Sequence, residues 1–276
     1  MSWLRAADGA GGLAPGPSAG PARIDALRAA YRAADPFPHL VLDDFLDHAL
    51  AERLAASFPP PQLATVRRNG VYQNGKRGYR PDTLGEHPSA ALLHAFNAPA
   101  VLALIDGLTG HRGLVPDPGF VGGGFHEIEA GGHLRIHADF LLHPRTGLAR
   151  RVNLIVFLNR DWEESWGGAL ELWDGAMKAC AVSIPPLFNR AVLFDTGRTS
   201  FHGHPDPLAC PPGITRRSLA LYYYGEAAPG EQLIPRTQWQ ARPGSGDGVS
   251  AGGALRRLLH RLRSASRLLV PDKRLG

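Results

Sequence analysis

A run of short β-rich segments in the second half of the chain restricts the possible folds more than any other feature. The segments lie between residues 118 and 225 and are separated by turn residues such as Gly, Pro and Asn. They are FHEIEA, HLRIHAD, RVNLIVFLN, ALELWD, KACAVSI, RAVLFDT and RRSLALYYY. Regular short strands with intervening turns predict a β-sandwich or a barrel.

Helical patterns precede these strands instead of alternating with them. Apolar residues recur with helical spacing in 22–34, 48–59 and 88–110, and a strand with a turn is predicted at 38–47. This order favours helices that pack against one side of a barrel. We therefore expect a mainly β fold with supporting N-terminal helices.

The composition changes towards both ends. Residues 1–21 are rich in Gly, Ala and Pro, and are predicted to be disordered. A second Gly/Pro/Ser-rich stretch, residues 226–253, is predicted to be a linker. The expected single domain therefore spans 22–225, with helical support at 22–117 and the β core at 118–225.

The charge is concentrated in residues 254–276, which hold seven Lys or Arg residues against one acid. The rest of the chain is close to neutral, so its charge does not favour a nucleic-acid-binding core. In the tail, leucines and arginines fall on opposite faces of a predicted amphipathic helix. This helix either docks on the body or contacts an anionic surface.

Two cysteines, Cys180 and Cys210, occur without a CxxC pair, which argues against a disulfide scaffold or a cysteine-built zinc site. The N-terminus lacks the apolar run of a signal peptide, and no apolar stretch has the length of a membrane span. We therefore expect a cytoplasmic protein.

The first chemical signal is His137 followed by Asp139 in GGHLRIHADF. On an extended strand, residues two apart point to the same face, so the imidazole and the carboxylate would lie together. Addition of a histidine from a later strand gives the 2-His-1-carboxylate set of non-haem iron(II) oxygenases. His202 and His204, in SFHGHPDPL, are the candidates.

An arginine opens the strand RRSLALYYY after these histidines. An iron(II) oxygenase with a keto-diacid cosubstrate needs a fixed cation for the far carboxylate. Arginine suits this task because its planar fork binds a carboxylate bidentately and stays charged when buried. The order of metal pair, third ligand and arginine is consistent with such an enzyme.

Six blocks in sequence order resemble the iron(II)/2-oxoglutarate-dependent dioxygenases, in the prolyl 4-hydroxylase-like branch. The blocks are RIHADF, NLIVFLNRDW, WGGALELWD, PLFNRAVLFDT, SFHGHPDPL and RRSLALYYY. The resemblance implies a double-stranded β-helix, a jelly-roll or cupin-like barrel. It also implies Fe(II), 2-oxoglutarate and O2 as cofactors, with ascorbate as a possible requirement for keeping the iron reduced.

The resemblance assigns roles to individual residues. His137, Asp139 and His202 would be the iron ligands, with His204 as the alternative to His202. Arg216 would bind the C5 carboxylate of 2-oxoglutarate. Strand alternation would turn Arg217 to the opposite face, and one side of the site would be lined by Arg216, Ser218, Ala220 and Tyr222.

The cosubstrate pocket departs from the pattern of the family at Phe157, where relatives often have a tyrosine. Since Phe157 cannot donate a hydrogen bond, we expect Asn153 or Ser218 to compensate. The alternation that directs His137 inward also directs Arg135 and His133 inward, so both are candidates for substrate contact.

Asp139 bears on the reaction because halogenating members of the family lack this carboxylate. We therefore expect hydroxylation of a peptidyl-proline or small-molecule substrate, with release of succinate and CO2. The alternatives are a non-catalytic sensor of 2-oxoglutarate or metal, and a cupin-like enzyme that uses another metal. The sequence does not indicate the oligomeric state.

The polar stretch 67–80 contains five cationic residues and two Asn-Gly pairs. The cations are Arg67, Arg68, Lys76, Arg77 and Arg80. We predict a solvated loop here, and the alternative is a mobile lid over the substrate.

Overall fold

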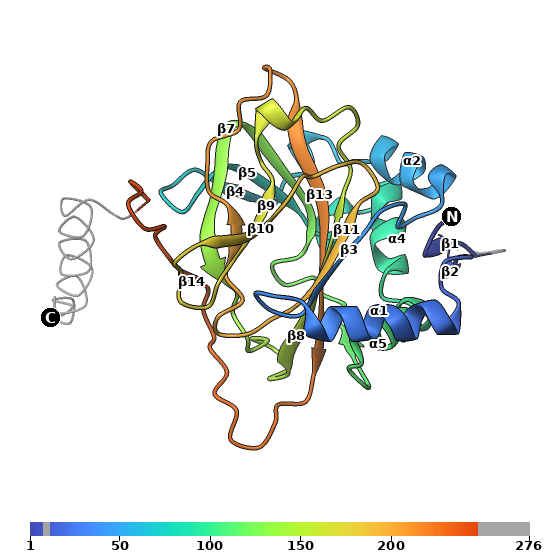
Figure 1. Cartoon of the computed structure of the whole chain (residues 1–276). Helices are drawn as coiled ribbons and strands as arrows, with labels where there is room; N and C mark the ends of the chain where they lie inside the picture. The colour runs from blue at the N-terminus through green and yellow to red at the C-terminus, as the bar shows by residue number, and fades with distance from the viewer. Residues whose placement is uncertain (8–11, 248–276) are drawn as a thin grey trace, which may run out of the picture.

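A computed structural model describes residues 1–7 and 12–247 and shows a mainly β protein with helices gathered on one side (Figure 1). The main sheet contains twelve strands. Its central order is β10-β9-β12-β7-β13-β8-β11-β3, and the pairs along it are antiparallel. The predicted mainly β fold with N-terminal helices is confirmed.

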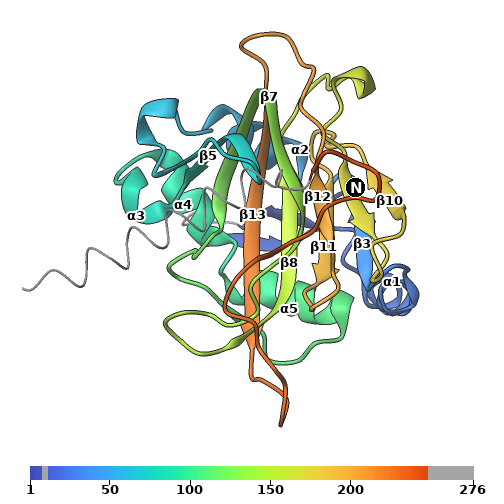
Figure 2. The same cartoon turned by 90° about the vertical axis from the view of Figure 1, so that its left-hand side faces the viewer.

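The longest strand is β7 (Gly124–Ala138), which joins two predicted strands into one. Its first half pairs with β13 (Thr215–Gly225) and its second half with β12 (His202–His204). The remaining strands of the order are β3 (His39–Leu42), β8 (Ala149–Phe157), β9 (Leu170–Trp173), β10 (Cys180–Ile184) and β11 (Ala191–Asp195). Figure 2 shows β7, β13, β8 and β11 side by side.

Four of the five described helices begin at a proline, a residue that suits the first helical turn because its missing N–H has no partner there. These helices are α1 (Pro21–Ala33), α3 (Pro81–Leu84), α4 (Pro88–Ala95) and α5 (Pro99–Thr109). The fifth, α2 (His48–Ala56), begins after Asp47, whose carboxylate accepts the Leu50 N–H at 3.0 Å. Short 3-10 turns lie at Pro61–Leu63 and Glu164–Trp166.

Within 1–7 and 12–247, no single helix has the length and apolar character of a membrane span; α4 and α5 meet that test only as a pair bent by 45°.

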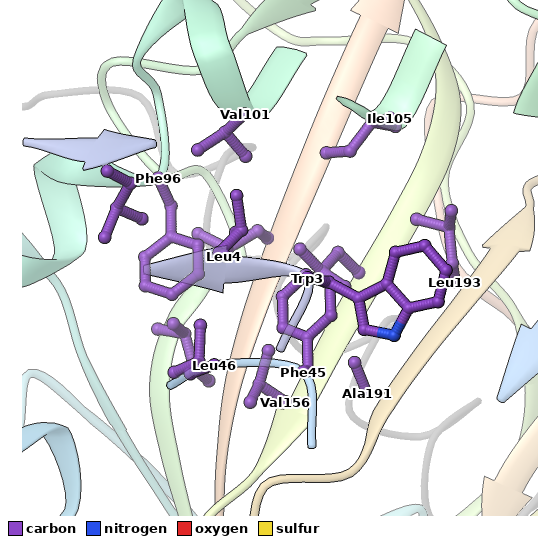
Figure 3. Packing of buried hydrophobic residues seen from close by; sticks show 14 of the residues in the cluster. Trp3, Leu4, Phe45, Leu46, Phe96, Val101, Ile105, Val156, Ala191 and Leu193 are labelled. Atoms are coloured by element: carbon purple, nitrogen blue, oxygen red, sulfur yellow. The ribbon is translucent and has the colours of Figure 1, made fainter. Parts of the chain in front are cut away.

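The main core fills the space between the helices and one face of the sheet (Figure 3). Figure 3 shows Val101 and Ile105 of α5 opposite Val156 of β8 and Leu193 of β11, all of them buried. The helices therefore cover one side of the barrel and leave its interior for the site described below.

The prediction that residues 1–21 are disordered is wrong for the described part. Strands β1 (Leu4–Ala6) and β2 (Leu13–Pro15) pair with each other. Trp3 and Leu4 are buried in the main core, where Figure 3 shows them beside Phe45 and Leu46. The Gly/Ala/Pro-rich composition suggested disorder, but these few apolar side chains bury enough surface to fix the segment.

Replacement of Trp3 with alanine is expected to lower the free energy of unfolding by about 3–5 kcal/mol, because a fully packed indole leaves a cavity. Denaturant unfolding monitored by circular dichroism measures this change. The control is Leu187→Ala, since Leu187 is 37% exposed and its loss should cost less than about 0.5 kcal/mol. Equal stability of Trp3→Ala and the unmodified protein would contradict the packing described.

The predicted linker 226–253 is also wrong over its described part, 226–247. The chain leaves β13, turns back and adds the short strand β14 (Gln238–Trp239) to β7 (Figures 1 and 2). Further along, Asp247 is buried and forms ion pairs with Arg135 and Arg242. This segment is therefore part of the folded body, whereas the predicted amphipathic tail 254–276 lies outside the described residues.

The stretch 67–80, predicted to be a solvated loop, is largely a hairpin. Its strands are β4 (Val66–Arg68) and β5 (Gln73–Tyr79), and β5 also pairs with β7. Pairing with a central strand satisfies the backbone groups that a loop would leave to water. The short strand β6 (Val115–Pro116) pairs with β13.

Candidate metal and cosubstrate site

The barrel encloses a cavity of about 370 Å³, and the predicted chemical residues meet at its wall. His137, Asp139, His202 and Arg216 all line it. They come from three elements, because β7 supplies the first histidine and leads directly into Asp139, β12 supplies His202, and β13 supplies Arg216.

His137, Asp139 and His202 form a compact group whose ligand atoms lie within 4.8 Å of one another. One carboxylate oxygen of Asp139 lies 3.6 Å from Nε2 of His137, and the other lies 3.5 Å from Nε2 of His202. The strand pairing places His202 directly opposite His137. His204, the alternative ligand, lies outside this group.

Both histidines are held with Nε2 free for a metal. Nδ1 of His137 lies 2.8 Å from the Arg135 carbonyl oxygen, and Nδ1 of His202 lies 2.9 Å from that of Ser200. A hydrogen bond from Nδ1 fixes the tautomer that leaves the Nε2 lone pair available. Burial, with the nearby His137, lowers the pKa of His202 to about 4, so this imidazole is neutral at pH 7.

Asp139 is held as a carboxylate by two partners on β8. Arg150 Nη2 and the Asn153 amide both donate to the same oxygen at 2.9 Å. Burial opposes ionisation, but the Arg150 guanidinium and the two imidazoles hold the pKa of Asp139 well below its usual range. Two imidazole nitrogens and one carboxylate, facing each other in a buried site, fit iron(II).

Arg150 is therefore a positioning residue for this carboxylate, and its side chain is only 1% exposed. Arg150→Met is expected to weaken metal binding about 10- to 100-fold, because groups that orient a metal ligand have effects of this size. Equilibrium dialysis against zinc(II) or iron(II) measures the change. The matched control is Arg151→Met, whose side chain instead pairs with Glu231. Equal weakening in both variants would contradict the role of Arg150.

Arg216 is buried with its fork directed to the cavity. Its Nε donates to the Gly168 carbonyl at 2.7 Å, and its terminal nitrogens have no partner among residues 1–7 and 12–247. Burial lowers the pKa of Arg216 to about 9 because no anion lies beside it. Gly168 permits this approach, since a Cβ there would lie 3.0 Å from Arg216 Cδ. A buried arginine without a counter-ion suits a carboxylate ligand.

The three residues predicted to complete the cosubstrate pocket take different places. Ser218 lines the cavity, opposite Phe157 in the strand pairing. Phe157 is fully buried and lies under the Arg216 guanidinium, with the ring centroid 4.9 Å from Cζ. Asn153 lines the cavity, but its oxygen accepts from Arg150 and its amide donates to Asp139, so it is not free to compensate for a tyrosine.

The prediction that Arg135 and His133 face the cavity is wrong. Arg135 donates to the Pro205 carbonyl and pairs with Asp247, and His133 bonds the Val71 carbonyl at 3.1 Å. The cause is an extra residue in β7. His202 and His204 are two residues apart but pair with His137 and Leu134, which are three apart. The inward face therefore shifts by one residue, and Leu134 lines the cavity instead.

Sequence reasoning also missed an aromatic pair beside the metal ligands. The Trp239 ring lies against His137, with centroids 4.9 Å apart, and stacks on Tyr72 at the same distance and an interplanar angle of 14°. The signal available was an isolated Trp in a stretch predicted to be a linker. By contrast, the predicted row of Arg216, Ser218, Ala220 and Tyr222 does line the cavity.

Residues 123–224 match the sequence model of the 2OG-Fe(II) oxygenase superfamily. The matched part contains the β core and all three members of the His-Asp-His group. The match and the His-Asp-His group together support a 2-oxoglutarate-dependent dioxygenase with Fe(II), 2-oxoglutarate and O2 as its cofactors. A search of curated protein sequences returned no match for the oxygenase.

Solved structures of similar fold include several oxygenases. A Trichoplax adhaerens prolyl hydroxylase, in complex with a hypoxia inducible factor peptide fragment, has 16% identity and a TM-score of 0.51, covering 73% of this chain and 92% of its own. A Pseudomonas putida prolyl-4-hydroxylase has 18% identity and a TM-score of 0.46, with 73% and 99% covered. HygX from Streptomyces hygroscopicus has 14% identity and a TM-score of 0.45, with 70% and 84% covered. The first similarity confirms the double-stranded β-helix.

Proposed function

We propose that the oxygenase hydroxylates an unactivated C–H bond of a small-molecule or peptidyl-proline substrate, with release of succinate and CO2. The observation that carries this proposal is the grouping of His137, Asp139 and His202 within 4.8 Å, on the wall of one cavity with the unpartnered fork of Arg216. Metal sites with these ligands occur in many classes of enzyme. The buried arginine beside this one suits a dicarboxylate cosubstrate.

The residues divide the work of binding and orientation. His137, Asp139 and His202 would hold the iron, and a three-ligand set leaves coordination positions for cosubstrate and oxygen. Bound iron with 2-oxoglutarate and O2 supplies the oxidising power for hydroxylation. Arg216 would anchor the far carboxylate of 2-oxoglutarate, and Phe157 beneath it limits how the guanidinium can turn. The buried residues around the cavity keep bulk water out and thereby limit side reactions.

The presence of Asp139 supports hydroxylation over halogenation, because its carboxylate takes a position that a halide would otherwise need. The cavity of about 370 Å³ lies at the lower end of the range for small-molecule sites, so a compact substrate fits it. A peptide would present a single residue, and the peptide in the Trichoplax complex is the reason to retain prolyl substrates.

The test is succinate release from 2-oxoglutarate with iron(II) and ascorbate across a panel of free amino acids, prolyl peptides and small metabolites. A substrate should stimulate succinate release and gain one oxygen atom by mass spectrometry. His137→Ala should show neither. Succinate release equal to that of His137→Ala across the panel would contradict the proposal. Binding of 2-oxoglutarate without oxygen consumption would instead support a sensor, and activity only with another metal would support a different cupin-like enzyme.

A further inference from the structure

The β4–β5 hairpin directs two cations into the cavity of the metal site. Arg68 and Lys76 lie directly opposite each other in the strand pairing, and both line the cavity that contains His137 and Asp139. Figure 1 shows this hairpin beside β7, with which β5 pairs. A stretch that looked like a solvated loop in the sequence therefore forms part of the wall of the site.

The other face of the hairpin differs because its cations are satisfied within the protein. Arg67 donates to the Pro61 carbonyl at 2.7 Å, and Arg77 pairs with Glu127 at 2.9 Å and with Glu129. Along a strand, successive side chains point to opposite faces. The paired cations of the hairpin therefore face away from the cavity. Arg68 and Lys76 face the cavity, and neither has a partner among residues 1–7 and 12–247.

The charges around the cavity do not balance. Among the described residues, its lining holds five cationic side chains and one carboxylate, that of Asp139. Arg150 pairs with Asp139, and Arg80 pairs with Asp82 at 3.0 Å. Arg216 is assigned to 2-oxoglutarate above. An iron(II) ion and a doubly charged 2-oxoglutarate cancel each other, so the cationic surplus remains after both have bound, and Lys76 and Arg68 are its members that no other group is assigned to.

Lys76 and Arg68 lie at a distance from Arg216, the residue assigned to 2-oxoglutarate. Ile128 of β7 pairs with Arg216 on one side and with Lys76 on the other, and Arg68 follows on the next strand. Neighbouring strands lie about 4.8 Å apart, so the backbone of Lys76 is about 10 Å from that of Arg216 across the sheet. Arg68 is further out and exposed, at the rim. Burial lowers the pKa of Lys76 to about 8, and the nearby Asp139 carboxylate opposes this shift.

We propose that the substrate of the oxygenase carries an anionic group, a carboxylate or a phosphate, which Lys76 and Arg68 bind while the C–H bond to be oxidised faces the metal ligands. This inference rests on the proposed function, because it names the substrate class of the same site. Cations without counter-ions attract an anionic group. Because they lie in the cavity that binds the substrate, they also fix its orientation.

The experiment uses protein saturated with iron(II) and 2-oxoglutarate without oxygen, so that Arg216 is already occupied. Isothermal titration calorimetry compares O-phospho-L-serine with L-serine, N-acetyl-L-proline with N-acetyl-L-prolinamide, and inorganic phosphate. We expect the anionic member of at least one pair to bind at least tenfold more tightly than its neutral counterpart. The pair that responds distinguishes phosphate from carboxylate. Lys76→Met and Arg68→Met should each weaken this binding about 10- to 100-fold, as expected for a charged hydrogen bond.

Two matched controls separate this site from general surface charge. Arg67→Met removes the neighbouring arginine on the other face of β4, and Lys178→Met removes an exposed lysine at a turn. Both should bind the anionic probes as the unmodified protein does. The proposal would be overturned if no anionic probe bound saturably, or if all four variants lost binding equally.

The cosubstrate measurement keeps this inference separate from the proposed function. The affinity for 2-oxoglutarate should fall in Arg216→Met but change less than about threefold in Lys76→Met. Equal loss in both variants, with anion binding unchanged, would assign Lys76 to the cosubstrate and overturn the inference. Absence of 2-oxoglutarate binding in the unmodified protein would overturn the proposed function itself.

Discussion

Replacement of His202 with alanine is expected to remove stoichiometric iron(II) binding and to lower 2-oxoglutarate turnover by about a thousandfold or more. The reason is geometric, because His202 Nε2 and His137 Nε2 lie on either side of the Asp139 carboxylate and no other donor of this group replaces it. Loss of one ligand from a three-ligand site leaves two donors, too few to hold the ion in place. Metal content after gel filtration and succinate formation measure the two effects.

The control for this variant is His204→Ala. His204 is also buried and lies two residues away on β12, yet it stands outside the ligand group. We expect its alanine variant to retain iron at one ion per chain. Retention of iron by His202→Ala together with its loss from His204→Ala would show that His204 is the third ligand.

Replacement of Arg216 with methionine is expected to weaken 2-oxoglutarate binding by about a hundredfold or more while iron binding remains. Two charge-assisted hydrogen bonds to a carboxylate, each contributing about 1.5–3 kcal/mol, account for an effect of this size. The measurement is the KM for 2-oxoglutarate, or its Kd without oxygen.

The neighbouring Arg217→Met is the matched control for this variant. Arg217 lies on the same strand but faces Glu127, with Nη2 3.3 Å from the carboxylate. Its loss should leave the affinity for 2-oxoglutarate unchanged within about twofold. A similar loss in both variants would indicate a general effect on β13 and contradict the specific role of Arg216.

Strand alternation correctly predicted the parts of the site that lie within one regular stretch of strand. The pairing of His137 with Asp139, and the row from Arg216 to Tyr222, follow from a period of two. His202 required the fold, because only the antiparallel pairing of β12 with β7 places it opposite His137. The resemblance to a known family supplied the assignment of His202, which residue spacing alone did not.

Alternation failed where one strand holds an extra residue. In β7 the extra residue turned Arg135 away from the cavity. In β8 strict alternation from Asn153 would place Arg151 inward, but Tyr223 and Tyr224 pair with Val152 and Arg150. Arg150 therefore takes the inward place and reaches Asp139. A β-bulge is difficult to predict from one sequence, because it is defined by the register between two paired strands.

Composition was the weaker guide at the chain ends. It averaged over residues 1–21 and so concealed Trp3, Leu4 and Leu13, which are buried. It also concealed Trp239, which lies against His137. A few large apolar side chains can order a Gly- and Pro-rich segment when a packed surface is available, and that surface belongs to the tertiary structure.

The most direct test of the account is equilibrium binding of 2-oxoglutarate to the protein with iron(II) in the absence of oxygen. The structure predicts one 2-oxoglutarate per chain, binding that depends on the metal, and loss of that binding in both Asp139→Ala and Arg216→Met. These two residues would act through different contacts, Asp139 on the metal and Arg216 on the far carboxylate. The account would be contradicted if 2-oxoglutarate bound equally well without metal, or with unchanged affinity in both variants.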